Sequence, residues 1–341
     1  MPRNARLAIA LLILSSVATG VAAQSYTVTD LGSLGGTPTA FAINDSGEVV
    51  GASRTVDSTV THAFYWTTAT GMVDIGTMGG NLSQAFGLNS HGVIVGTSNL
   101  TANANGVAFV WTAESGFHDL GSNGDAYSIS DRGLIAAIAG NNQVAFVLSK
   151  AAGRVLLGTL GGSNTVPHAM NEQGQVVGYS FTAGNSVYHA FLWSRATGMK
   201  DLGTLGGINS YGLGVNQSDQ VVGWATIPGI SFAYHAFHWT QSGGMKDLGT
   251  FGGTYSLALG INESGQVVGS ANIAGDTDAH AFLWTVKGGM IDLNSTIPAG
   301  SGWDLNSASA INVNGQIVGD GLYNGQIHAF LLTPASMLAI F

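Results

Sequence analysis

The stretch NEQGQVVGYSFTAGNSVYHAFLWSRATGMKDLGTLGG (residues 171–207) contains one whole repeating unit of this chain. It begins with an Asn-x-x-Gly turn and a Val-Val-Gly run, continues with His-Ala-Phe-Leu-Trp, and ends in Asp-Leu-Gly followed by Gly-Gly. Each of these three signatures returns seven times, and the spacing from Asp30 to Asp292 over six repeats averages about 44 residues. This period is typical of four-stranded propeller blades.

Each repeat divides into four short strands. The residue before the turn Asn is always apolar and the one before that is small, as in Gly214-Val215, which is the period-two alternation of a strand. Asn at the first and Gly at the fourth turn position favour a type I turn between the first two strands. The glycine that ends each Val-Val-Gly run, such as Gly51 or Gly178, suggests close approach of a neighbouring sheet. No helical period is present after the N-terminal segment, so the fold class is all-β.

The two ends of the repeat array are complementary. Residues 26–32 form a lone fourth strand, whereas the last repeat has only its first three strands, through Leu332. If the first strand completes the last sheet, the ring has no open edge. The sequence therefore predicts a seven-bladed β-propeller over 24–333, with four antiparallel strands per blade and a short tail at 334–341. An open β-solenoid is the alternative.

The N-terminal 23 residues have the layout of a secretory signal peptide. Arg3 and Arg6 precede an apolar run from Leu7 to Leu14, and small residues lead to an expected cleavage site after Ala23. The protein is therefore expected to be secreted, to the periplasm or outside the cell, with no membrane span. The net charge of −9, which becomes −11 without the two arginines, argues against a nucleic-acid partner. With no cysteine, the chain has neither disulfides nor thiolate metal sites.

The combination of Asp-Leu-Gly-Thr-Leu-Gly-Gly, the Asn-turn hairpin and His-Ala-Phe-Leu-Trp resembles the bacterial extracellular HAF repeat family. The resemblance covers essentially the whole chain after the signal segment. It implies an exported propeller-type protein and no particular activity. Some members carry a C-terminal sorting tail, for which residues 334–341 are too short.

The repeated histidines are interpreted as structural. A metal ion needs ligands that converge on one point, whereas one His per blade points to separate places. Five of these histidines have an Asp 12 residues further on, or in the first strand for the last repeat, and a buried hydrogen bond within each blade is expected. The expected pairs are His62 with Asp74, His189 with Asp201, His235 with Asp247, His280 with Asp292, and His328 with Asp30.

Other apparent motifs also have structural explanations. The glycine run 203–207 lacks the helix and Lys of a phosphate loop, and it is interpreted as a blade-to-blade crossing. Asp276 and Asp278 lack a third ligand, so no metal site and no cofactor are predicted. No nucleophile elbow, zinc-binding helix or distinct carboxylate pair is present, and no catalytic residue is assigned. Five tryptophans share one register of the third strand and are expected in the core: Trp66, Trp111, Trp193, Trp239 and Trp284.

The variable loops remain as candidate binding elements. The loops between second and third strands and the crossings between blades should share one face of the disc, and binding commonly resides in such loops. The candidate ligand-binding residues are Tyr188, Trp224, Phe232, Tyr234 and Trp303. The leading hypothesis is a monomeric, non-enzymatic scaffold that binds a glycan or an envelope or extracellular protein. A propeller enzyme acting on glycans, as hydrolase or lyase, and a purely structural envelope protein are the alternatives.

Overall fold

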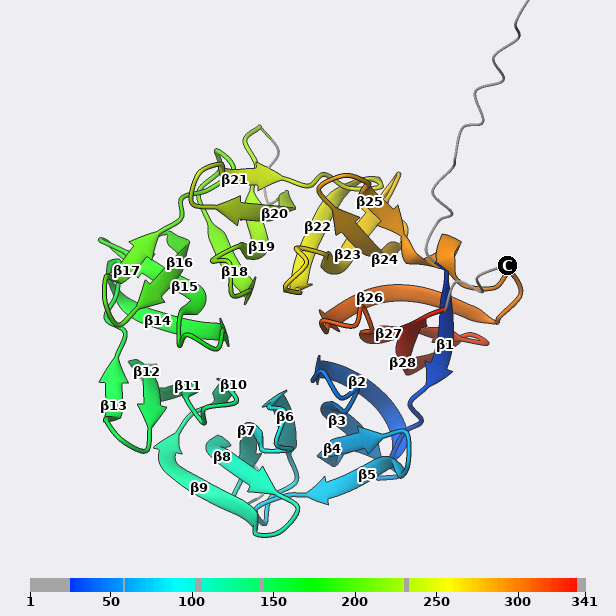
Figure 1. Cartoon of the computed structure of the whole chain (residues 1–341), viewed down its shortest axis with the longest axis horizontal. Coiled ribbons are helices and arrows are strands. Elements are labelled where there is room, and N and C mark those ends of the chain that lie inside the picture. Colours follow the sequence, from blue (N-terminus) through cyan, green and yellow to red (C-terminus); the bar gives the residue numbers. More distant parts are fainter. Residues whose placement is uncertain (1–24, 58, 102–105, 141–143, 230–232, 336–341) are drawn as a thin grey trace, which may run out of the picture.

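The computed structural model describes residues 25–57, 59–101, 106–140, 144–229 and 233–335. Seven antiparallel four-stranded sheets stand around a central opening, as predicted (Figure 1). The first strand of each repeat lies nearest the centre and the fourth lies at the periphery (Figure 1). The predicted signal segment, Phe232 and most of the predicted tail lie outside the described residues. Within the described residues, no helix is long and apolar enough to cross a membrane.

Blades 1 to 4 follow the chain in order, each with its strands from the centre outward. Blade 1 contains β2 (Gly35–Ile43), β3 (Val49–Thr55), β4 (Thr61–Thr67) and β5 (Gly71–Gly76). Blade 2 contains β6 (Ser83–Leu88), β7 (Ile94–Asn99), β8 (Gly106–Thr112) and β9 (Gly116–Asn123). Blade 3 contains β10 (Ala126–Ile129), β11 (Ile135–Ala139), β12 (Val144–Ser149) and β13 (Gly153–Leu156). Blade 4 contains β14 (Gly161–Met170), β15 (Val176–Thr182), β16 (Tyr188–Ser194) and β17 (Gly198–Asp201).

Blades 5 to 7 complete the ring. Blade 5 contains β18 (Ser210–Val215), β19 (Val221–Thr226), β20 (Tyr234–Thr240) and β21 (Gly244–Asp247). Blade 6 contains β22 (Gly252–Ile261), β23 (Val267–Ile273), β24 (Ala279–Thr285) and β25 (Gly289–Asp292), and the 3-10 turn η1 (Leu293–Thr296) follows it. Blade 7 contains β26 (Trp303–Ile311), β27 (Ile317–Tyr323), β28 (Gln326–Pro334) and the N-terminal β1 (Tyr26–Asp30).

Strand β1 closes the ring by pairing with β28, as the complementary ends predict. The antiparallel register runs from Tyr26 opposite Pro334 to Asp30 opposite Phe330. The backbone N–H of Ala335 also donates to the carbonyl of Ser25, so the pairing extends slightly beyond the predicted domain end at residue 333. All four strands of blade 7 are thus present although they come from opposite ends of the chain.

The glycine that ends each Val-Val-Gly run has a different role from the predicted one. A Cβ on Gly51 would lie 2.0 Å from the carbonyl oxygen of Thr39 and 2.8 Å from the Phe64 ring, both in the same blade. The inner strand shifts register at this point, between Ala40 and Ala42, which is a bulge that brings its backbone toward the glycine. The close approach is therefore within one sheet, and the expectation of a neighbouring sheet was wrong.

The hydrophobic core consists of layers between adjacent blades. One layer joins Phe64 and Trp66 of blade 1 to Val318 and Leu331 of blade 7, with Leu31 between them. The Phe of the His-Ala-Phe signature is almost fully buried in every blade. Burial of a side chain of this size contributes about 1.5–3 kcal/mol. The core therefore stabilises the contacts between blades as well as each blade.

The turn asparagines form a hydrogen-bonded ring around the central opening. The Asn44 amide donates to the carbonyl of Asn89, and the pattern continues to Asn312, whose amide donates to the carbonyl of Asn44. The ring is interrupted only at Ser130, which has no amide to reach Asn171. The seven turn residues are all buried, at 1–7 % exposure. A residue type predicted only from turn preference thus also links the blades.

One buried histidine should destabilise the fold. His238 is 6 % exposed, its Nε2 has no hydrogen-bond partner, and the Trp284 ring lies 5.3 Å away. Three other blades have leucine at this register, namely Leu192, Leu283 and Leu331. Because an unpaired buried polar atom costs about 1–3 kcal/mol, we expect His238→Leu to stabilise the protein by about 1–2 kcal/mol in urea unfolding.

The same substitution carries a pH signature. Burial, with the nearby Lys246 charge, lowers the pKa of His238, so the unfolded chain binds its proton first as the pH falls below 6.5. The advantage of the leucine variant should therefore grow from pH 7 to pH 5. An equal or lower stability of the variant at both pH values would contradict this interpretation.

Candidate functional site

A ring of seven side chains lines the central channel. Each belongs to the third residue before the turn of its blade, and together they surround most of a cavity of about 400 Å³. The chain places large rings in four consecutive blades and aliphatic or small side chains in the other three. The seven residues are Phe41, Phe86, Tyr127, His168, Leu213, Leu259 and Ser309.

The four rings contact each other in sequence across blades 1 to 4. The Phe41 and Phe86 centroids are 5.7 Å apart, and Phe86 stacks on Tyr127 at 5.7 Å with an interplanar angle of 14°. His168 follows at 5.3 Å from Tyr127. One half of the channel wall is therefore a continuous aromatic surface.

His168 connects this wall to the inner strand of blade 5. Its Nε2 lies 2.6 Å from the hydroxyl oxygen of Tyr211, and the ring centroids are 4.8 Å apart. Burial lowers the pKa of His168 to about 4 and raises the pKa of Tyr211 well above its usual value. At neutral pH both groups are uncharged, so this point of the wall offers hydrogen bonding without charge.

From Tyr211 the rings continue toward the edge where β19 ends and β20 begins. Tyr211 stacks on Trp224 at 5.7 Å and 15°, and Trp224 lies 5.0 Å from Tyr234. Tyr188 meets Trp224 edge-on at 6.2 Å. We call the whole surface the aromatic tract: Phe41, Phe86, Tyr127, His168, Tyr179, Tyr188, Tyr211, Trp224, Tyr234 and Tyr255.

The structure brings together three of the five residues proposed from the sequence. Tyr188, Trp224 and Tyr234 are all half-buried in the aromatic tract. Trp303 lies apart in blade 7, where it stacks on Tyr323 at 5.0 Å, and Phe232 lies outside the described residues. The channel rings were missed because only the two positions directly before the turn were compared. The third position would have shown the aromatic residues in four successive repeats.

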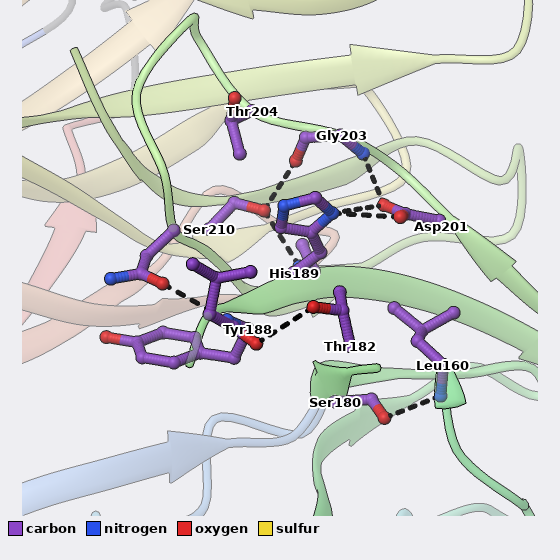
Figure 2. A network of polar contacts seen from close by, with 12 residues as sticks. Leu160, Ser180, Thr182, Tyr188, His189, Asp201, Gly203, Thr204 and Ser210 are labelled. Carbon is purple, nitrogen blue, oxygen red and sulfur yellow. Dashed lines mark hydrogen bonds and ion pairs between the residues drawn. The ribbon is translucent and has the colours of Figure 1, made fainter. Parts of the chain in front are cut away.

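The His and Asp pairs lie within the blades, at the surface. In all five, His Nδ1 lies 2.7–2.9 Å from an Asp oxygen, with histidine side chains 17–28 % exposed rather than buried. In Figure 2, Asp201 also accepts from the backbone N–H of Gly203. Ser210 is fully buried and donates to the Gly203 carbonyl, while its oxygen accepts from the N–H of Ala190. Ser210, His189 and Asp201 therefore brace the blade and do not form a nucleophilic triad.

The opposite end of the channel is lined by the turns and carries carboxylates. Asp131 accepts from the N–H of Ser90, and Glu172 accepts from the N–H of Asp131, so each side chain latches one blade to the previous one. Asp276 likewise accepts from the backbone N–H of Thr254. Among the residues that the structure describes, no group of three or more His, Asp or Glu is arranged to hold a metal ion.

Comparison with known proteins supports the architecture. No protein-family model and no curated protein matches this sequence. TolB from Acinetobacter baumannii is similar at 12 % identity and a TM-score of 0.51, over 71 % of this chain and 62 % of TolB. Virginiamycin B lyase from Staphylococcus aureus gives 10 % and 0.57, over 91 % of this chain and 99 % of the lyase. An oligogalacturonate lyase solved with manganese gives 12 % and 0.60, over 92 % and 95 %.

These likenesses establish a propeller fold. At such identities they show the fold alone, since one fold hosts many unrelated functions. The chain also spans less than two thirds of TolB. The resemblance to HAF repeats rests on the three sequence signatures themselves, because no family model matches.

The channel histidine predicts a pH effect on stability. Its pKa is about 4 in the folded state and 6.5 in the reference state, so the unfolded chain binds more protons between these values and stability falls as the pH drops. A full shift of this size corresponds to about 3 kcal/mol, and water in the channel reduces it to about 1–2 kcal/mol. We expect His168→Phe, which copies blades 1 and 2, to remove this part of the loss between pH 7 and pH 4.

The measurement is urea unfolding of both proteins at several pH values. Loss of the Tyr211 partner changes the baseline of the variant but not its slope, because the phenol does not titrate in this range. Identical slopes for the two proteins would show that His168 is already solvated like a free histidine.

Proposed function

We propose that this protein is an exported, non-enzymatic binding module whose ligand is a glycan held on the aromatic tract. The observation that carries the proposal is the continuity of the rings from the channel wall to the loop face. Sugars present an apolar C–H face that packs on aromatic rings, with hydroxyl groups at its edge. Tyr and Trp match both parts, since each joins a flat apolar body to a polar tip.

The polar groups of the tract favour binding over chemistry. Proton transfer is most effective when the pKa of the acid or base lies near the working pH. The pKa of His168 is about 4 and that of Tyr211 is raised, so both are displaced away from neutrality. Burial also raises the pKa values of Tyr188 and Tyr234, which keeps their hydroxyls as hydrogen-bond donors.

The test is a glycan array probed with residues 24–341, followed by calorimetry on the best ligand. Trp224 is half-buried between Tyr188, Tyr211 and Tyr234, so Trp224→Ala removes a central stacking surface. We expect at least about a tenfold loss of affinity, the effect of 1.4 kcal/mol, and a larger loss when Tyr234→Ala is added.

Trp303→Ala provides the matched control. This tryptophan is equally half-buried but belongs to blade 7, away from the tract, so ligand affinity should stay within about twofold when folding is verified by melting. Equal losses for Trp224→Ala and Trp303→Ala would contradict the position of the site. A folded protein with no saturable glycan ligand would favour the structural envelope role.

The second candidate is a propeller enzyme that acts on glycans, as lyase or hydrolase. The specific observation in its favour is the hydrogen bond between His168 and Tyr211 inside the channel, which joins a neutral imidazole to a protonated phenol. Turnover of a bound glycan that is lost in His168→Phe would establish this function and reject the binding module. Unchanged glycan after prolonged incubation supports the binding module.

A further inference from the structure

One tryptophan of the repeated register differs from the other four. Trp66, Trp193, Trp239 and Trp284 are 4–5 % exposed, as expected for core residues. Trp111 in β8 is only half-buried. The prediction that all five belong to the core therefore fails at Trp111, and the reason lies in the neighbouring blade.

In two other blades, a lysine of the preceding blade covers the corresponding ring. The Nζ atom of Lys200 lies 4.7 Å from the centroid of Trp239 and donates to the side-chain oxygen of Gln241 at 2.5 Å. The Nζ atom of Lys246 lies 5.5 Å from the Trp284 ring. An ammonium over an indole face is a favourable electrostatic contact, because the ring face is negative.

Blade 1 cannot supply this cation to Trp111. The strand partner of Tyr65 is Val73, at the place where Lys200 pairs with Leu192 in blade 4. Val73 is 42 % exposed, and Ala113 occupies the place that Gln241 has beside Lys200. Both the ammonium and its oxygen acceptor are therefore missing beside Trp111.

An open groove is found at this place. It has a volume of about 520 Å³ and lies between the turns of blades 1 and 2, on the face opposite the loops of the aromatic tract. Its walls carry two carboxylates and two aromatic rings, and its lining residues include no Lys or Arg. The residues that matter here are Glu48, Tyr65, His91, Trp111, Ala113 and Glu114.

The carboxylates are arranged differently. Glu48 is fixed, since it accepts from the Tyr65 hydroxyl at 2.5 Å and from the Asn44 amide at 2.6 Å. Glu114 is exposed on the turn after Trp111 and accepts no hydrogen bond in the structure as described. Four of the other repeats have glutamine where Glu48 stands, so the negative charge is a feature of this groove: Gln175, Gln220, Gln266 and Gln316.

We propose that this groove binds an organic cation of a ligand, an ammonium on an alkyl stem such as the side chain of a lysine in a peptide. The ammonium would lie over Trp111 with Glu48 and Glu114 beside it, as Lys200 lies over Trp239 within the chain. The alkyl stem would pack on Tyr65. The site is independent of the glycan proposal, because it shares no residue with the aromatic tract.

The test follows the indole N–H resonance of Trp111 in ¹⁵N-labelled protein, assigned with Trp111→Phe. The probes are Ac-Gly-Lys-Gly-NH₂, the isosteric norleucine peptide without the charge, and n-butylamine. We expect a saturable shift with the lysine peptide, at least about tenfold weaker binding of the norleucine peptide, and about threefold weaker lysine binding to Glu114→Gln. Tighter binding of the peptide than of n-butylamine identifies a peptide lysine as the occupant, and equal binding shows that the stem and ammonium suffice.

A lysine supplied by the protein itself gives the sharpest control. Val73→Lys should place an ammonium over Trp111, as Lys200 does for Trp239, and should abolish binding of the lysine peptide. Val56→Lys makes the same change at an 89 % exposed position in the loop between β3 and β4 and should leave it unchanged. Equal shifts with the lysine and norleucine peptides, or undiminished binding to Val73→Lys, would overturn the proposal.

Discussion

Deletion of residues 25–31 should destabilise the protein by about 5 kcal/mol or more and lower its melting temperature by about 10 °C or more. Tyr26 and Leu31 are each 2 % exposed, and removing a buried side chain of this size costs about 2–5 kcal/mol. The deletion also removes five paired positions along β28 and leaves that strand as an open edge. The loss approaches the whole stability of a typical domain.

Point variants and a peptide separate the two contributions. Leu31→Ala should cost about 2–3 kcal/mol, whereas Thr29→Ala on the exposed side of the same strand should cost less than about 0.5 kcal/mol. A synthetic peptide of residues 25–34 should restore the melting temperature of the deleted protein by adding the missing strand. An unchanged melting temperature after deletion would show that blade 7 holds with three strands, and it would argue against closure.

Asn216→Ala should produce the second large effect, a loss of about 3 kcal/mol in the free energy of unfolding. The Asn216 oxygen accepts from the N–H groups of Ser218 and Gln220, and its amide donates to the carbonyl of Asn262 in the next blade. Asn216 is 1 % exposed, so water cannot replace these partners without rearrangement. Each buried group left unpaired costs about 1–3 kcal/mol.

The interruption of the asparagine ring supplies the controls. Asn216→Ser copies Ser130, whose oxygen still accepts from the N–H of Leu134, so it should lose less than the alanine variant. Ser130→Asn should stabilise the protein by about 1 kcal/mol by adding a donor to the carbonyl of Asn171. Urea unfolding measures all three. A cost below about 0.5 kcal/mol for Asn216→Ala would mean that the ring contributes no stability.

The two proposed binding surfaces use opposite ends of the same scaffold. The aromatic tract lies where strands such as β19 end and β20 begins, whereas the groove beside Trp111 lies between the short turns. Both arise where one blade departs from its repeat, at Tyr211 and Trp224 on one face and at Val73 and Glu48 on the other. Variation within a rigid frame is a common way to build binding sites.

The sequence predicted the fold well for a physical reason. Period-two alternation, turn residues and repeat length are local properties, and they are visible in a stretch as short as residues 171–207. Closure by β1 was also predictable, because the count of strands at the two ends is a property of the chain. The role of Gly51 was not, since the bulge opposite it appears only when the inner strand pairs with its neighbour.

The candidate site was predicted in part. Tyr188, Trp224 and Tyr234 stood out as aromatic residues in or beside variable loops, whereas Tyr127 and His168 looked like ordinary strand positions. Their contact depends on the curvature that brings seven inner strands around one axis, which no single repeat specifies. Trp303 had the same sequence signal as Trp224, yet the ring places it on another blade beside Tyr323.

By itself, the sequence determined the repeating unit, the number of blades and the strand that closes them, because these follow from local pattern and from counting. Only the tertiary structure decided which side chains meet across blades. The Asn ladder, the unpartnered His238 nitrogen and the groove beside Trp111 are contacts between residues about one repeat or less apart in the chain, on different strands. Such contacts depend on the distance and rotation between neighbouring sheets, and these are set by the packing of the whole ring.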